Sequence, residues 1–209
     1  MAVLPGSLLS DFRIVVADTP VQFHEWMEDG WALVVALKAM SPTCSTEVAA
    51  LTQLVAPLAA CNTKVLGVAA DSPEIIHAWL DDLRDVLDCV PGFEVVADTA
   101  MSASTVLGFV DETVGNGLHR TALVVSPEKK VVATVTYPVT NGRNFAELLR
   151  VLQAAQLTAA KRVATSAGWR AGDPVMLPPS LSQADAERLY PAGVTVLRPY
   201  LRTVAQPLP

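Results

Sequence analysis

The sequence predicts an α/β fold, a mixed β-sheet flanked by helices, with a small C-terminal extension. Two observations indicate the sheet and its helices. Short apolar runs typical of buried strands alternate with stretches of helical periodicity, and two β-rich runs late in the chain flank a short polar turn. A third observation indicates the extension, because prolines interrupt the pattern beyond Thr165. We therefore expect one domain over residues 1–165 and an irregular extension over residues 166–209.

The first clear strand and helix lie within residues 31–54. The apolar run Trp31–Leu37 predicts a buried strand. Ser41 is a favourable N-cap and Pro42 suits the first helical position, so Cys44 falls in the first turn of a helix. Unpaired backbone N–H groups and the helix dipole favour an anion there, which makes a thiolate a usable nucleophile at neutral pH. The spacing leaves a second interpretation equally open, namely that Cys44 is a buried structural thiol.

Two further strand–helix units follow along the chain. Residues 65–70 form a short apolar run that predicts a buried parallel strand. Ser72 and Pro73 then supply a cap and a first helical residue. Apolar residues recur at helical spacing in the predicted helix, namely Ile75, Ile76, Trp79, Leu80, Leu83 and Leu87. Residues 93–97 predict another strand, and residues 98–110 predict another helix.

A hairpin and a helix complete the predicted domain. The β-rich runs 120–126 and 131–137 flank the polar turn 127–130 and predict an antiparallel pair that joins the sheet. The next helix is predicted from one apolar stripe, formed by Phe145, Leu148, Leu149, Leu152 and Leu157. A strand that leads to a cysteine at the start of a helix, with a hairpin and a helix later, is the plan of the thioredoxin-like fold.

The extension over residues 166–209 differs in composition from the domain. Prolines recur throughout it, and only residues 182–190 predict a helix, with Ser182 as its cap. We expect the rest to form an extended arm that cannot fold around a core of its own.

The composition excludes several classes of protein. The 209 residues are 51% hydrophobic and 17% charged, which is typical of a folded chain and not of a disordered one. A net charge of -6 argues against a nucleic-acid partner, since phosphate binding needs clustered Lys and Arg. No apolar stretch reaches the roughly 18 residues that a membrane span needs. The first residues also lack the pattern of a secretory signal.

The cysteines indicate the redox compartment. Cys44, Cys61 and Cys89 form no C-x-x-C pair, and an odd, sparse set of this kind is typical of a reducing environment. We therefore expect a cytoplasmic protein without a disulfide framework. The scattered cysteines and histidines show no metal-ligand spacing, and we expect no zinc and no cofactor.

Several longer motifs carry a resemblance to a known family. They are NGRNF in residues 141–145 with the helix and KRVAT that follow, GDPVMLPPSL in residues 172–181, HRTALVVSPEKK in residues 119–130, and SPTCSTE around Cys44. With these motifs the chain resembles the 1-Cys peroxiredoxins over most of its length. The resemblance implies a thioredoxin-like fold and a thiol peroxidase that reduces hydrogen peroxide and organic hydroperoxides. It also implies a homodimer in which the C-terminal extension reaches the partner subunit.

The same resemblance assigns the site residues. It makes Cys44 the peroxidatic cysteine, whose thiolate becomes sulfenic acid. Ser41 takes the position of a hydroxyl that hydrogen-bonds the peroxide and the thiolate, and Arg120 takes that of an arginine that holds the thiolate. A guanidinium beside sulfur stabilises charge in the thiolate and in the transition state. Without the resemblance, Arg120 would be a surface charge at the start of a strand. Glu47 matches a family position too, and it either hydrogen-bonds within the site or only favours the helix start.

The resemblance also bears on the other two thiols. Two-cysteine relatives carry a resolving cysteine near the C-terminus, and no cysteine follows Cys89 here. We therefore expect an external thiol as reductant, with Cys61 and Cys89 as ordinary core or surface thiols.

Two positions depart from the family motif P-x-x-x-T/S-x-x-C. Leu37 stands at the proline position, and Ala36 replaces a histidine that is usual nearby. Leucine neither fixes φ nor removes a donor, so we expect a looser loop and a displaced peroxide pocket. The alternative function is a weakened or inactive relative that acts as a redox sensor, a chaperone-like protein or a binding protein.

Overall fold

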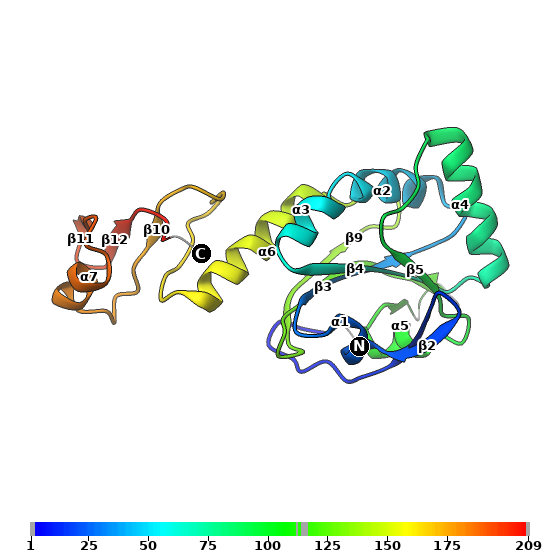
Figure 1. Cartoon of the computed structure of the whole chain (residues 1–209), viewed down its shortest axis with the longest axis horizontal. Coiled ribbons are helices and arrows are strands. Elements are labelled where there is room, and N and C mark those ends of the chain that lie inside the picture. The colour runs from blue at the N-terminus through cyan, green and yellow to red at the C-terminus, as the bar shows by residue number, and fades with distance from the viewer. Residues whose placement is uncertain (1–2, 112, 114–116, 208–209) are drawn as a thin grey trace. The chain divides into compact units, whose positions relative to one another are not determined.

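The computed structural model describes residues 3–111, 113 and 117–207 (Figure 1). By compactness the chain divides into two units, Met1–Phe145 and Ala146–Pro209. This division assigns helix α6 (Phe145–Ala160) almost wholly to the second unit. The predicted domain boundary lies further on, after Thr165, and stays a prediction.

A five-stranded mixed sheet forms the centre of the first unit, in the order β5-β4-β3-β8-β9. β3 pairs in parallel with β4, and β4 with β5, whereas β8 pairs antiparallel with both β3 and β9. The strands are β3 (Trp31–Leu37), β4 (Thr63–Ala69), β5 (Glu94–Ala97), β8 (Arg120–Val125) and β9 (Val131–Tyr137). The predicted mixed sheet and its hairpin are confirmed.

Helices cover both faces of this sheet (Figure 1). On one side lie α2 (Pro42–Thr52), α3 (Val55–Ala60) and α4 (Pro73–Leu87); on the other lie α1 (Phe23–Met27) and α5 (Ser102–Val106). The apolar cluster on the α1 and α5 side takes alternate residues of the strands, because successive side chains of a strand point to opposite faces. Two antiparallel pairs lie outside this sheet, β1 (Arg13–Val16) with β2 (Thr19–Gln22) and β6 (Val110–Asp111) with β7 (Gly117–Leu118).

Two predicted helix starts are confirmed by their caps. Ser41 Oγ accepts a hydrogen bond from the backbone N–H of Cys44 at 3.4 Å, and Pro42 opens α2. Ser72 caps α4 in the same way, with Pro73 as its first residue. Each cap satisfies a backbone donor that the helix itself leaves unpaired. The cap at Ser41 fixes Cys44 in the first turn of α2.

The helix predicted over residues 98–110 is wrong in extent, because only α5 is helical there. The Asp98 carboxylate accepts hydrogen bonds from the N–H groups of Ala103 and Ser104, at 3.2 and 2.7 Å, so the helix begins several residues later than predicted. Gly108, at a φ of 67°, ends the helical stretch, and the chain enters β6 shortly afterwards.

The second unit folds around a small core of its own. β10 (Val175–Met176), β12 (Leu201–Val204) and β11 (Thr195–Arg198) form an antiparallel sheet, and α7 (Gln183–Leu189) begins at its predicted cap, Ser182. The core consists of Val163, Trp169, Val175, Leu177, Leu181, Ala186 and Val204. The expectation of an arm without a core is therefore wrong. Proline interrupts long elements, but the short elements between prolines still bury these side chains.

Two negative findings apply to the residues that the structure describes. No helix among them is both long and apolar enough to cross a bilayer. Their His, Cys, Asp and Glu side chains form no group of three that could hold a metal ion. The expected lack of a metal or cofactor stays a prediction.

Candidate active site

Hydrogen bonds within α2 and from the neighbouring helix α4 fix the first turn of α2, which carries Cys44. Besides accepting the Cys44 N–H at its side chain, Ser41 accepts a hydrogen bond at its carbonyl oxygen from Ser45 Oγ, at 3.0 Å. Ser45 Oγ in turn accepts a hydrogen bond from Nε1 of Trp79, at 2.9 Å. Trp79 belongs to α4 and is buried, so the neighbouring helix fixes the turn that carries the cysteine.

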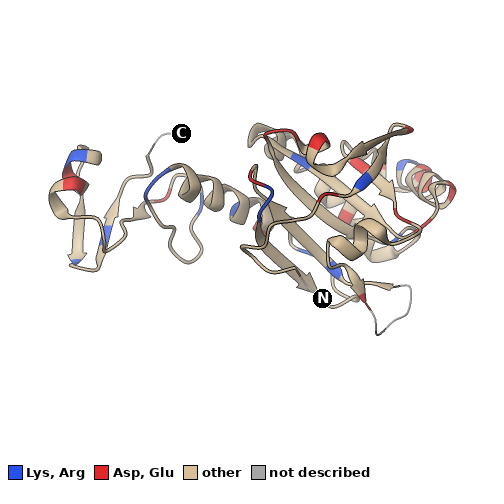
Figure 2. Cartoon of the chain, turned by 90° about the horizontal axis from the view of Figure 1, so that it is seen from below, with Lys and Arg blue, Asp and Glu red and all other residues tan. Residues whose placement is uncertain are grey.

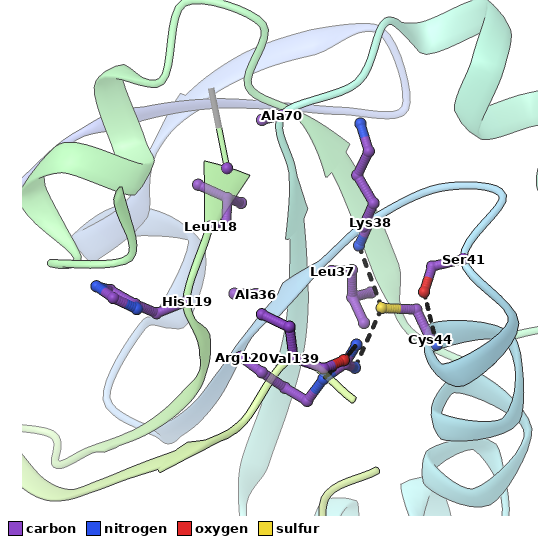
Figure 3. Close-up of a pocket in the computed structure, with 11 residues that line it drawn as sticks. Ala36, Leu37, Lys38, Ser41, Cys44, Ala70, Leu118, His119, Arg120 and Val139 are labelled. Atoms are coloured by element: carbon purple, nitrogen blue, oxygen red, sulfur yellow. Dashed lines mark hydrogen bonds between the residues drawn. The ribbon is translucent and has the colours of Figure 1, made fainter. Parts of the chain in front are cut away.

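The Cys44 sulfur accepts two hydrogen bonds (Figure 3). The backbone N–H of Lys38 lies 3.4 Å from Sγ, and Nη1 of Arg120 lies 3.3 Å from it. These donors come from the loop after β3 and from the start of β8, so three separate segments meet at the sulfur. N–H donors, one of them cationic, stabilise a thiolate. The structure thus brings Cys44 and Arg120 together as the resemblance implied.

The Arg120 guanidinium is oriented by two further acceptors. Nε and Nη2 donate to the carbonyl oxygen of Val139 at 3.2 and 2.8 Å, and Nη1 also donates to Glu47 Oε2 at 2.6 Å. Only 8% of the Arg120 surface is exposed. The interpretation of Arg120 as a surface charge is therefore wrong.

Glu47 bridges two buried arginines. Arg143 Nε and Nη2 donate to its two carboxylate oxygens at 2.9 and 2.7 Å, and the backbone N–H of Arg143 donates to Oε1 at 2.6 Å. The same guanidinium donates to the carbonyl oxygens of Thr121 and Ala36, at 2.7 and 2.8 Å, which ties α2 to β8 and β3. Glu47 therefore hydrogen-bonds within the site, and this settles the choice left open by the sequence.

The charge state of Glu47 follows from these contacts. Burial of Glu47 opposes ionisation. The hydrogen bonds and charge of Arg143, with the charge of Arg120, outweigh that effect and hold the pKa of Glu47 below its ordinary value. Glu47 is thus an ionised carboxylate at neutral pH and a fixed anchor for the arginine at the sulfur.

Sequence reasoning missed Arg143. The residue stands in the NGRNF motif, just before α6, and 96 positions separate it from Glu47. No local periodicity links positions so far apart. The only available signal was an arginine inside a motif shared with the family.

A second carboxylate, Asp71, holds the loop after β3. Its Oδ2 accepts a hydrogen bond from the backbone N–H of Ala39 at 2.9 Å, and its Oδ1 pairs with Lys38 Nζ at 2.5 Å. The preceding residue, Leu37, is still part of β3, where it lies opposite Ala69 of β4. The sheet and Asp71 thus hold the segment on both sides of Lys38, and the looser loop expected from the loss of the motif proline stays a prediction.

A cavity of about 330 Å³ gives access to the sulfur. Its lining consists of Ala36, Leu37, Lys38, Ser41, Cys44, Ala70, Gly117, Leu118, His119, Arg120 and Val139 (Figure 3). Although only 2% of the Cys44 surface is exposed, the sulfur faces this cavity and is not sealed in the core. The interpretation of Cys44 as a purely structural thiol has no support in this arrangement. Ser41 lines the same cavity, and its hydroxyl is therefore within the site.

The other two cysteines lie away from Cys44. Cys89 is buried, and its sulfur contacts Oγ1 of Thr52, the last residue of α2. Thr52 lies eight positions after Cys44 in the helix, which corresponds to about 12 Å along the axis. Cys61 precedes Asn62, whose carbonyl oxygen bonds the N–H of Trp31 at the start of β3. Cys44 follows the end of β3, about 20 Å away along the strand.

Comparison with known proteins identifies the family. Residues 5–134 match the model of the AhpC/TSA family, and residues 154–193 match the model of the C-terminal domain of 1-Cys peroxiredoxin. The chain belongs to the 1-Cys peroxiredoxin family. Its members are thiol peroxidases, and the thioredoxin-like fold implied by the resemblance is confirmed.

Individual relatives match over nearly the whole chain. A 1-Cys peroxiredoxin of Dirofilaria immitis is 33% identical, over 98% of both chains. Human peroxiredoxin-6 is 33% identical, over 98% of this chain and 100% of its own. Among solved structures, a cysteine-to-serine mutant of the peroxiredoxin 6 of Arenicola marina matches with a TM-score of 0.90 at 28% identity, covering 100% of both chains. The yeast mitochondrial 1-Cys peroxiredoxin matches with a TM-score of 0.88 at 28% identity, covering 97% of this chain and 99% of its own.

Proposed function

We propose that Cys44 is the peroxidatic cysteine of this thiol peroxidase and that Ser41 and Arg120 support it. One observation carries the proposal: a sulfur at the start of a helix accepts hydrogen bonds from the Lys38 N–H and the Arg120 guanidinium, and faces a cavity large enough for a hydroperoxide. These donors stabilise the thiolate, which is the reactive form of cysteine.

The reaction that this geometry supports is attack on the terminal oxygen of a hydroperoxide. The thiolate electron pair forms an S–O bond while the O–O bond breaks, so sulfur is oxidised to sulfenic acid. The other peroxide oxygen leaves with the electron pair of the O–O bond and takes up a proton, giving water or an alcohol. Arg120 stabilises the charge that moves from sulfur to the leaving oxygen, and the Ser41 hydroxyl hydrogen-bonds the peroxide.

An external thiol then completes the cycle. Its thiolate attacks the sulfenic sulfur, water leaves, and a second thiol reduces the mixed disulfide to restore Cys44. The positions of Cys61 and Cys89 support an external reductant, because both lie about 12 Å or more from Cys44 along regular elements. A disulfide to either would require the backbone to move, since its Cα atoms can be at most about 7 Å apart.

The alternative function, a catalytically weakened or inactive relative, is not favoured. The relatives over the full length are peroxiredoxins, and the residues at the sulfur keep a reactive arrangement. A protein that only binds partners would not need a buried arginine held against a thiol.

Competition kinetics with hydrogen peroxide tests the assignment. The unsubstituted chain should react far faster than a free thiol, and Cys44→Ser should abolish the reaction. Cys61→Ser is the matched control and should keep the rate, because Cys61 lies at the other end of β3 from the sulfur. A rate no better than that of a free thiol, or the same rate after Cys44→Ser, would overturn the proposal.

We also propose that the chain functions as a homodimer in the cytoplasm. The exposed side chains of β11 and the turn after it, among them Val196, Leu197 and Tyr200, support a contact between subunits through the second unit. Sparse, unpaired cysteine usage supports a reducing compartment. Light scattering should give a dimer for the full chain and a smaller species after truncation at Thr165. Cell fractionation tests the location.

A further inference from the structure

Leu37 is seated in space that Gly67 leaves open. A Cβ atom added to Gly67 would lie 2.6 Å from Cδ1 of Leu37, closer than two carbon atoms can approach. Leu37 ends β3, and Gly67 lies in β4, the next strand of the sheet. The side chain of Leu37, which stands at the position of the motif proline, thus packs diagonally over Gly67 of β4, where no side chain is present.

The space above Gly67 is also closed by atoms of the next strand. The same added Cβ would lie 3.3 Å from Cγ2 of Val95 and 3.5 Å from the carbonyl oxygen of Glu94, both in β5. Glycine inside a strand ordinarily weakens it, and it often marks a place where another group approaches closely. Here the approaching group is the Leu37 side chain, which is 2% exposed.

Leu37 also lines the cavity in front of the sulfur. The residue after it donates its backbone N–H to Cys44 Sγ, so the leucine side chain stands beside the reacting atom (Figure 3). Other apolar residues, Ala36, Ala70, Leu118 and Val139, continue the lining. At about 330 Å³ the cavity lies within the range of sites that bind small organic molecules, roughly 300–1,000 Å³. Hydrogen peroxide has no apolar part that could contact this wall.

We propose that Leu37, seated on Gly67, is the specificity-determining residue that favours hydroperoxides with an apolar substituent over hydrogen peroxide. The proposal rests on the peroxidase function of Cys44. The hydroperoxide group reaches the sulfur, and the apolar substituent packs against the leucine side chain. An apolar contact of this size discriminates between substrates by about tenfold or more.

The test compares kcat/KM for cumene hydroperoxide with kcat/KM for hydrogen peroxide in a double-mutant cycle. Leu37→Ala should lower this ratio about tenfold. Gly67→Ala should also lower it, because the new Cβ displaces Leu37 into the cavity. In the Leu37→Ala background, Gly67→Ala should have no further effect on the ratio. Gly92→Ala is the matched control, since its Cβ would make only ordinary contacts with Val55, at 3.4 Å or more.

Thermal unfolding gives a second readout that does not depend on activity. Gly67→Ala overpacks the sheet and should lower the melting temperature by about 5 °C in the unsubstituted chain, but by much less with Leu37→Ala. An unchanged ratio in active Leu37→Ala protein would overturn the specificity role and leave the peroxidase function standing. Equal effects of Gly67→Ala with Leu37 and with Ala at position 37 would refute the claim that the Leu37 side chain packs against Gly67. An unsubstituted chain without activity on either hydroperoxide would overturn both the proposed function and this inference.

Discussion

Replacing Glu47 by glutamine removes the negative charge that lies between two buried guanidinium groups. The Glu47 surface is 2% exposed, and the side chains of Arg120 and Arg143 are 8% and 0% exposed. Glutamine keeps the size of the side chain and one acceptor oxygen, but it turns an NH2 group toward donors. Two positive charges would then face each other with no carboxylate between them.

Glu47→Gln should lower the free energy of unfolding by more than an ordinary substitution does. Removing one partner of a buried ion pair costs about 3–5 kcal/mol, and we place Glu47→Gln near the lower end because its shape is kept. For a chain of this size each kcal/mol corresponds to roughly 2–4 °C, so the melting temperature should fall by about 6–12 °C. Circular dichroism during heating measures it. Glu74→Gln on the exposed start of α4 is the matched control and should lower the melting temperature far less than Glu47→Gln does.

The same substitution should slow the chemistry at temperatures where the variant is folded. Glu47 Oε2 holds Arg120 Nη1, which also donates to the sulfur. A displacement of the guanidinium by about 1 Å corresponds to a loss of about a hundredfold in rate. Competition kinetics with hydrogen peroxide measures it. If Glu47→Gln melted and reacted like the unsubstituted chain, the argument that Glu47 positions Arg120 would be refuted.

The pH dependence of the free energy of unfolding should also depend on the Glu47 carboxylate. The pKa of Glu47 in the folded chain lies below its ordinary value of 4.5, which applies to the unfolded chain. Its contribution to stability is therefore complete above that ordinary value and is lost as the pH falls through the lowered pKa. Glu47→Gln should remove this part of the acid dependence. Urea unfolding at a series of pH values measures the difference, and parallel curves for the two proteins would contradict the expectation.

Substitutions at three further positions test the surroundings of the sulfur. Ser41→Ala should cost about 1 kcal/mol of stability and reduce the peroxide rate, whereas Ser41→Thr should keep both, as measured by melting and by competition kinetics. Asp71→Asn keeps one acceptor for the Ala39 N–H but loses the charge that holds Lys38, so the rate should fall by about tenfold, or 1.4 kcal/mol, in stopped-flow assays. Leu37→Pro should give no gain in the rate with hydrogen peroxide, because Asp71 already holds the loop; a gain of about tenfold would show that the missing proline limits the chemistry.

The elements that the sequence predicted well are those decided by local chemistry. The Ser41 and Ser72 caps, each followed by proline, place two helix starts correctly. The apolar run Trp31–Leu37 becomes a strand that is buried throughout, because β4 and β8 flank it and helices cover both faces of the sheet. The same signals put Cys44 in the first turn of α2, which is the core of the site.

What the sequence could not predict depends on contacts between distant positions. Arg143 reaches Glu47 only after β8, β9 and the loop before α6 have folded back, and Asp71 reaches Ala39 only across the edge of the sheet. The error over residues 98–110 has a different cause. There the Asp98 side chain competes for backbone N–H groups and delays the helix, which apolar periodicity does not reveal.

The charges around the sulfur explain why these distant contacts matter. Among the described side chains at the site, Lys38 is paired with Asp71, and Glu47 compensates only one of the two buried arginines. One positive charge is therefore left over beside Cys44. In the function that we propose, a thiolate at Cys44 would balance it through the hydrogen bond from Arg120. The proposal therefore links the stability of the ion pairs at Glu47 to the charge of the cysteine.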